Sequence, residues 1–216
     1  MKYGESTFDI IYLLFAVVTG ILILVKRRDT VGGLMGSAVL ILGCGDAFHL
    51  VPRVLNYFVD ADFTAWLGCG KLVTSITMTV FYLLMYRLWL RVYDEKESKG
   101  LSITIYLLTA ARVILCLLPQ NKWLENDSSV LWGVIRNIPF VILGVIIVCL
   151  YFKDRRQIKE FRFIWLLVTL SFLFYIPVAV AASLVPMLGM LMLPKTVCYM
   201  IIVWLFWRHA VKSNNS

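Results

Sequence analysis

Charged and strongly polar side chains stand inside long apolar segments of this sequence. Asp46 and His49 lie three residues apart in one segment, and Lys or Arg occupies four of the others. Charged groups inside a membrane-spanning helix are costly and usually serve a function. The candidate ligand-binding residues are Asp46, His49, Arg53, Lys71, Ser75, Tyr82, Arg112, Arg136, Asn137, Tyr175, Lys195 and Tyr199.

The spacing of these residues indicates polar faces on helices. Asp46, His49 and Arg53 follow the pattern i, i+3, i+7, which places them on one face of a helix. Two later segments carry similar faces, formed by Lys71, Ser75 and Tyr82 in one and by Lys195 and Tyr199 in the other. We therefore expect these faces to turn toward the interior of a helix bundle.

The charges also share one depth in the membrane. At the rise of an α-helix, each lies about 9–12 Å from the same end of its segment, although successive segments run in opposite directions. The five residues are Asp46, Lys71, Arg112, Arg136 and Lys195. This agreement predicts a polar, outward-facing cavity in the outer half of the bilayer.

The charge balance of this layer indicates the sign of a ligand. Four cations stand against Asp46 alone, and burying unpaired cations in a membrane is unfavourable. Arg grips phosphate and carboxylate groups with two hydrogen bonds, whereas Lys acts as a point charge. The sequence therefore predicts a site for an organic anion or an anionic lipid headgroup.

Structural roles compete with this interpretation. Arg53 is expected to extend its guanidinium to the membrane interface, and Arg112 can do the same or turn inward. Asp46 and His49 are also compatible with a structural pair, with Asp46 bridging an arginine. A structural membrane subunit, whose charges satisfy one another, is therefore the third hypothesis beside binding and catalysis.

Asp46 and His49 are the candidate catalytic residues of the enzyme hypothesis. A carboxylate with a histidine can activate water, here for an intramembrane hydrolase acting on a lipid. Gly45-Asp46 resembles the Gly-Asp of lysoplasmalogenases over two residues only, and those enzymes have an additional helix and a second membrane acid. With only two His in the chain, no zinc site, metal or other cofactor is predicted.

The elements that position these residues follow from composition. Of 216 residues, 61% are hydrophobic and 16% charged, which excludes a soluble enzyme, a disordered chain, a disulfide scaffold and a nucleic-acid-binding module. We predict an all-α, polytopic membrane protein that forms a single domain over residues 1–216. Its seven transmembrane helices are expected at about 7–25, 31–54, 64–90, 101–118, 130–152, 161–184 and 187–207.

The loops indicate the orientation. Fourteen Lys and Arg residues lie on one side of the predicted bundle and three on the other. This asymmetry predicts an outside N-terminus and a cytoplasmic C-terminus, and the short loops favour a bacterial inner membrane. Gly32, Gly33 and Gly36 form a small-residue face, which we expect to pack within the chain, with a homo-oligomer contact as the alternative.

Overall fold

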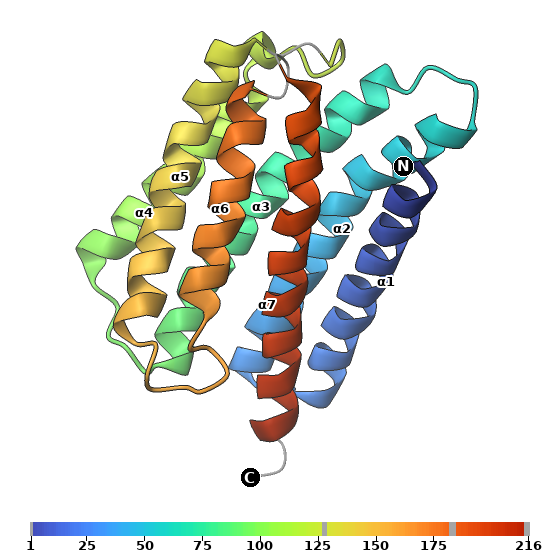
Figure 1. Cartoon of the computed structure of the whole chain (residues 1–216). Coiled ribbons are helices and arrows are strands. Elements are labelled where there is room, and N and C mark those ends of the chain that lie inside the picture. The colour runs from blue at the N-terminus through green and yellow to red at the C-terminus, as the bar shows by residue number, and fades with distance from the viewer. Residues whose placement is uncertain (1, 127–128, 182–184, 214–216) are drawn as a thin grey trace.

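The computed structural model describes residues 2–126, 129–181 and 185–213, and within these ranges the chain is helical (Figure 1). The predicted all-α fold with seven helices is confirmed, and six of the seven are long enough to span a membrane. Two short 3₁₀ helices accompany them. The elements are α1 (Lys2–Lys26), α2 (Thr30–Phe58), α3 (Thr64–Val92), α4 (Lys99–Leu117), η1 (Pro119–Asn121), α5 (Val130–Lys153), α6 (Ile164–Ala181), η2 (Pro186–Leu191) and α7 (Met192–Ser213).

The helices have the length and composition of membrane spans. Six of them are long and apolar enough to cross a bilayer, and α6 is a shorter apolar helix. Many large apolar side chains point outward from the bundle, such as Leu14, Leu107 and Leu131. Such surfaces suit lipid and not water. The chain is a multi-pass membrane protein.

Several predicted boundaries were wrong. Helix α1 begins at Lys2 and not near residue 7, because its first polar residues are also helical. The sixth helix begins at Ile164 and not at 161, since turns occupy the residues before it. Its predicted end at 184 falls outside the described residues. The predicted seventh helix is divided into η2 and α7, and α7 continues beyond 207 to Ser213.

The helices form a bundle whose two chain ends lie at opposite ends (Figure 1). Consecutive helices pack side by side, and α7 contacts both α6 and α1. The α2–α3 and α4–α5 connections lie at the same end as the N-terminus. We call this the N-terminal end of the bundle.

Glycines bring α1, α2 and α3 close together. Gly36 of α2 faces Leu24 of α1 so tightly that a Cβ would collide with it, and Gly32 is packed against Arg27. These two members of the small-residue face therefore pack within the chain, while Gly33 faces open space. On the other side of α2, Gly70 of α3 lies against the backbone of Phe48 and His49. Small residues permit such close approach of membrane helices.

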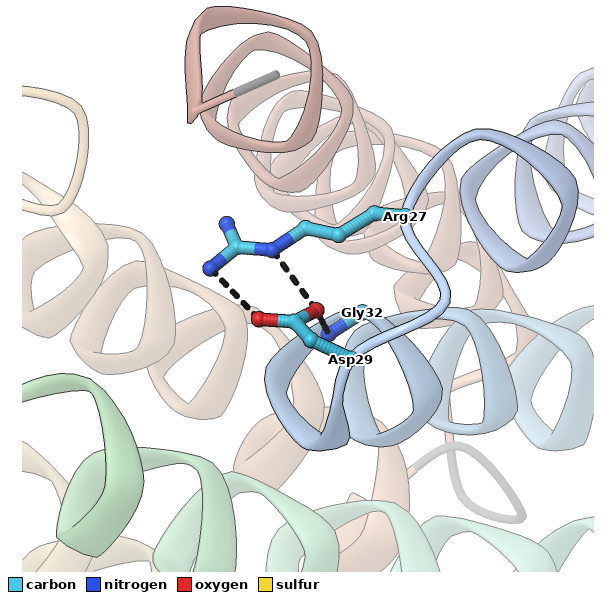
Figure 2. A network of polar contacts seen from close by, with 3 residues as sticks. All are labelled: Arg27, Asp29 and Gly32. Atoms are coloured by element: carbon cyan, nitrogen blue, oxygen red, sulfur yellow. Dashed lines mark hydrogen bonds and ion pairs between the residues drawn. The ribbon is translucent and has the colours of Figure 1, made fainter. Parts of the chain in front are cut away.

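The turn between α1 and α2 is held by one aspartate (Figure 2). Asp29 Oδ1 accepts from the Gly32 backbone N–H at 2.8 Å, which caps the start of α2. Arg27 donates to both carboxylate oxygens, with Nε–Oδ1 at 2.9 Å and Nη2–Oδ2 at 3.1 Å. Partial burial raises the pKa of Asp29, but these hydrogen bonds outweigh it, so the pKa lies below its ordinary value of 3.8.

Candidate functional site

A polar cavity of about 490 Å³ lies between the helices toward the N-terminal end. Its lining comes from α1, α2, α3, α5, α6, α7 and the α4–α5 connection. Of the twelve ligand-binding residues predicted from sequence, eight line it: Asp46, His49, Arg53, Lys71, Ser75, Arg136, Tyr175 and Lys195. The other four, Tyr82, Arg112, Asn137 and Tyr199, are buried outside this lining.

The wall of the cavity includes two carboxylates, Asp9 from α1 and Asp46 from α2. Asp46 Oδ2 accepts a hydrogen bond from the hydroxyl of Tyr12 at 2.6 Å, and no ion pair between described residues includes Asp46, so it bridges no described arginine. Asp9 is 4% exposed and lies within electrostatic range of Asp46. Asp9 Oδ2 is buried without a hydrogen-bond partner. This side of the cavity is therefore acidic.

Arg136 of α5 is positioned by the α4–α5 connection. Its Nη1 donates to Oδ1 of Asn121 at 2.8 Å, and its guanidinium lies 4.4 Å from the ring centroid of Trp123. The Asn121 amide nitrogen caps the end of α4 by donating to the carbonyls of Leu115 and Leu118, at 2.7 and 2.9 Å. Asn121, the residue that caps the C-terminal end of α4, thus also fixes the position of the Arg136 guanidinium on α5.

Lys71 and Lys195 complete the cationic lining. Lys71 lies at an exposed position, where Nζ donates to Oδ1 of Asn126 at 2.7 Å. Lys195 is partly buried, and Nζ lies 5.0 Å and 5.7 Å from the ring centroids of Tyr175 and Tyr199. Cation–π contacts of this kind hold an ammonium in place while leaving its positive charge uncancelled.

Arg53 is neutralised within the protein. Its guanidinium forms an ion pair with Glu5 of α1, and Glu5 also accepts from the hydroxyl of Tyr57 at 3.0 Å. The expected extension of Arg53 to the membrane interface is therefore replaced by a link between α1 and α2. Arg53 borders the cavity but adds no net charge to it.

An aromatic floor lies further from the N-terminal end than the cavity. It consists of Phe81, Tyr82, Phe140, Phe172 and Tyr199. On α3, α5 and α7 these rings follow the lining residues by one or two helical turns, and on α6 Phe172 precedes Tyr175 by about one turn. The Tyr82 and Tyr199 hydroxyls are hydrogen-bonded at 3.0 Å, and Ser171 Oγ donates to Tyr199 at 3.4 Å. The rings pack edge to face, with Tyr82–Phe140 centroids 5.2 Å apart. The cavity is closed below by packed side chains.

Two predicted ligand-binding residues support the wall from behind. Asn137 accepts from the Tyr175 hydroxyl at 2.7 Å and donates to the Gly133 carbonyl, also at 2.7 Å. Arg112 is 2% exposed, so it does not reach the membrane interface. Arg112 donates to the backbone carbonyl of Arg136 and lies 5.1 Å from the Phe140 centroid. Both residues fix the α5 segment that carries Arg136.

The structure changes the expected charge balance. Asp9, which is not among the candidate residues predicted from the sequence, is buried beside Asp46. Among the described residues, the surplus of cations in this layer falls from three to two when Asp9 is included. The spacing of Asp9 and Tyr12, i and i+3 in an apolar segment, was a signal for this position. Asn121, Trp123 and Asn126 carry no such signal, because they lie in an irregular connection.

The geometry bears on the hydrolase hypothesis. Asp46 and His49 border the same cavity, but no hydrogen bond between them is present, although both are described. His49 Nδ1 is buried without a partner. A general base is normally oriented by a hydrogen bond from a third group. Asp46 and His49 therefore do not form the hydrogen-bonded carboxylate–histidine pair of a water-activating site.

Comparison with known proteins gives one limited similarity. The ER lumen protein-retaining receptor A of Arabidopsis thaliana is 30% identical to the chain over 74 residues. The match covers 33% of this chain and 34% of the receptor, so only about a third of either protein is compared. No protein-family model and no solved structure matches the chain. The chain is thus a helical membrane protein with weak similarity to a membrane receptor.

Proposed function

We propose that this protein binds an organic anion, or the anionic headgroup of a lipid, in the cavity at its N-terminal end. The protein would act as a receptor or transporter for that ligand. Lys71, Arg136 and Lys195 would neutralise the anion, while Asp46 and His49 would orient these cations.

One observation carries the proposal: three cations from three different helices border one cavity. Lys71 comes from α3, Arg136 from α5 and Lys195 from α7. Lys71 and Arg136 are close enough to repel each other, and His49 lies within electrostatic range of both lysines. An anion between them would relieve this repulsion, and it would do so more strongly inside a membrane than in water.

The size and lining of the cavity support an organic ligand. A volume of about 490 Å³ lies within the range of small-molecule sites. Tyr175 and Trp123 provide aromatic surface beside the cations. The similarity to a protein named as a receptor favours binding over catalysis, although it spans a third of each chain.

The proposed orientation places the N-terminal end outside the cell and the C-terminus in the cytoplasm. The basis is the positive-inside rule, applied to the basic loops at the opposite end. The cavity would then open outward. Location in a bacterial inner membrane is predicted from the short loops. Association between copies of the chain is a second prediction of the same kind.

Native mass spectrometry of the protein released from mild detergent tests the proposal. Wild-type protein should retain an anionic molecule of defined mass, and Arg136→Gln should lose it. Arg156→Gln is the matched control, because Arg156 is exposed in the α5–α6 connection at the opposite end of the bundle. The control should bind as the wild type does.

The alternatives give different outcomes. If all three proteins retain nothing, even after anionic lipids and metabolites are added, the binding proposal fails and a structural subunit is favoured. If the wild-type protein hydrolyses an added lipid, and Asp46→Asn binds this lipid without hydrolysing it, the enzyme hypothesis replaces the binding proposal. If Arg136→Gln and wild type retain the same mass equally, the assigned site is wrong.

A further inference from the structure

The cavity has an acidic side and a basic side. Asp9 and Asp46 come from α1 and α2, which lie together at one side of the bundle (Figure 1). Arg136 comes from α5 at the other side, and Lys71 from α3. Like charges are therefore neighbours: Asp9 is within electrostatic range of Asp46, and Lys71 of Arg136. Such an arrangement repels within each pair and is stabilised by a ligand with charges of both signs.

Asp9 is the residue that needs a partner from outside the chain. Asp46 receives the Tyr12 hydrogen bond and lies in electrostatic range of Lys195. Asp9 is 4% exposed, its Oδ2 accepts no hydrogen bond, and none of the ion pairs among described residues includes it. A buried carboxylate oxygen left unsatisfied is destabilising, so a donor that enters the cavity would be bound strongly.

Two amide groups help to hold the basic side. Lys71 donates to the Asn126 amide oxygen, and Arg136 donates to that of Asn121. Amide oxygens fix the positions of these cations without adding a negative charge. An anionic group of the ligand placed between Lys71 and Arg136 would relieve the repulsion between these two cations.

We propose that the ligand is zwitterionic, with its anionic group bound between Lys71 and Arg136 and a protonated amine bound by Asp9. The inference rests on the proposed function, because it assigns a second charged group to the same ligand. Two sources carry this chemistry: a free amino carboxylate and a lipid headgroup in which a phosphate is joined to an amine.

The test for the free molecule is a series of ω-amino carboxylates of increasing chain length. Each is compared with the alkanoate that has a methyl group in place of the ammonium, and binding is measured by isothermal titration calorimetry on the full-length protein. One chain length should bind about tenfold or more tightly than its alkanoate, the size of one charged hydrogen bond. That length reports the separation of the two subsites.

Asp9→Asn should remove this preference and leave alkanoate binding intact. Asp60→Asn is the matched control, because Asp60 is exposed in the α2–α3 connection at the same end. If Asp9→Asn does not fold, the wild-type comparison of each amine with its methyl analogue still decides the question.

The lipid source is tested by native mass spectrometry with phosphatidylethanolamine and phosphatidylglycerol. Preferential retention of phosphatidylethanolamine by wild type, lost in Asp9→Asn, supports the zwitterion with a lipid as its source. If alkanoates and phosphatidylglycerol bind as tightly as their amine-bearing counterparts, the zwitterion is wrong while the anion site stands. If no member of either set binds, the proposed function fails with it.

Discussion

The hydroxyl of Tyr12 donates a 2.6 Å hydrogen bond to Oδ2 of Asp46 and thereby joins α1 to α2 beside the cavity. Tyr12 is completely buried, and its neighbour Asp9 is carried on the same helix face. The Tyr12–Asp46 hydrogen bond therefore fixes the position of Asp9 relative to Asp46, the two acidic residues of the cavity.

Tyr12→Phe should destabilise the protein by about 1–3 kcal/mol, because Asp46 loses its donor and no other group replaces it. Thermal unfolding in detergent measures the change. Tyr106→Phe is the control, since Tyr106 is 40% exposed on the outer surface of α4. Equal unfolding temperatures for the two variants would show that the Tyr12 bond contributes nothing.

Asn121→Ala should weaken both the fold and anion binding. It removes the amide that caps α4 and the oxygen that accepts from Arg136. We expect a loss of about 1–3 kcal/mol in unfolding free energy, since buried polar groups lose their partners. Gln120→Ala, at the exposed neighbouring position, should change neither property. Full binding by Asn121→Ala would contradict the role given to this residue in orienting Arg136.

Gly70→Ala should force α2 and α3 apart at the level of His49. The added Cβ would meet the carbonyl oxygen of Phe48 and the Cα of His49, which are backbone atoms that cannot turn aside. Overpacking of this kind costs about 1–3 kcal/mol, and unfolding measurements in detergent should detect it. Gly33→Ala provides the opposite result: its Cβ meets nothing, and alanine favours the helix by up to about 1 kcal/mol.

The Asp29 network predicts a pH effect at the other end of the bundle. The pKa of Asp29 is lower in the folded protein than its ordinary value of 3.8, so its charged form stabilises the fold. This contribution is fully present above pH 3.8 and is lost as the pH falls through the folded pKa. Acid unfolding of Asp29→Asn should accordingly show less pH dependence below that point than wild type or Asp60→Asn.

Asp29→Ala separates the charge from the cap. Asparagine can still accept from the Gly32 N–H, whereas alanine cannot, so Asp29→Ala should lose about 1 kcal/mol more at neutral pH. Equal stability of the alanine and asparagine variants at neutral pH would show that the cap is unimportant.

The sequence predicts the helices well, because lipid demands long apolar segments that composition alone reveals. It also predicts most of the charged residues that line the cavity, since charges at one depth on several helices have few other arrangements. It fails at Asp9, because a carboxylate near the end of a predicted helix is as compatible with the membrane surface as with a cavity. It also misses the first turn of α1, before residue 7. The apolar pattern marks the part of a helix that lipid covers, not the helical turns beyond it.

Contacts that depend on the relative rotation of helices were also beyond the sequence. Arg112 and Arg136 carry the same charge and are predicted at the same depth in the membrane. Arg112 nevertheless donates a hydrogen bond to a backbone carbonyl, whereas Arg136 lines the cavity. Asn121, which caps the end of α4, accepts a hydrogen bond from Arg136 on α5, and the two residues are separated by an irregular connection. Neither relationship has a periodic pattern, because each is set by how α4 packs on α5.

The aromatic floor has an electrical consequence. Water that enters the polar cavity would extend the aqueous phase into the bundle, whereas Tyr82 and Tyr199 are buried beneath it and their hydroxyls are hydrogen-bonded to each other. A membrane voltage falls across insulating material and hardly at all across water. The floor and the apolar helices below it would therefore carry most of the voltage, and a charged ligand that enters and leaves by the cavity mouth would cross little of it. Its affinity would then be almost independent of the energised state of the membrane.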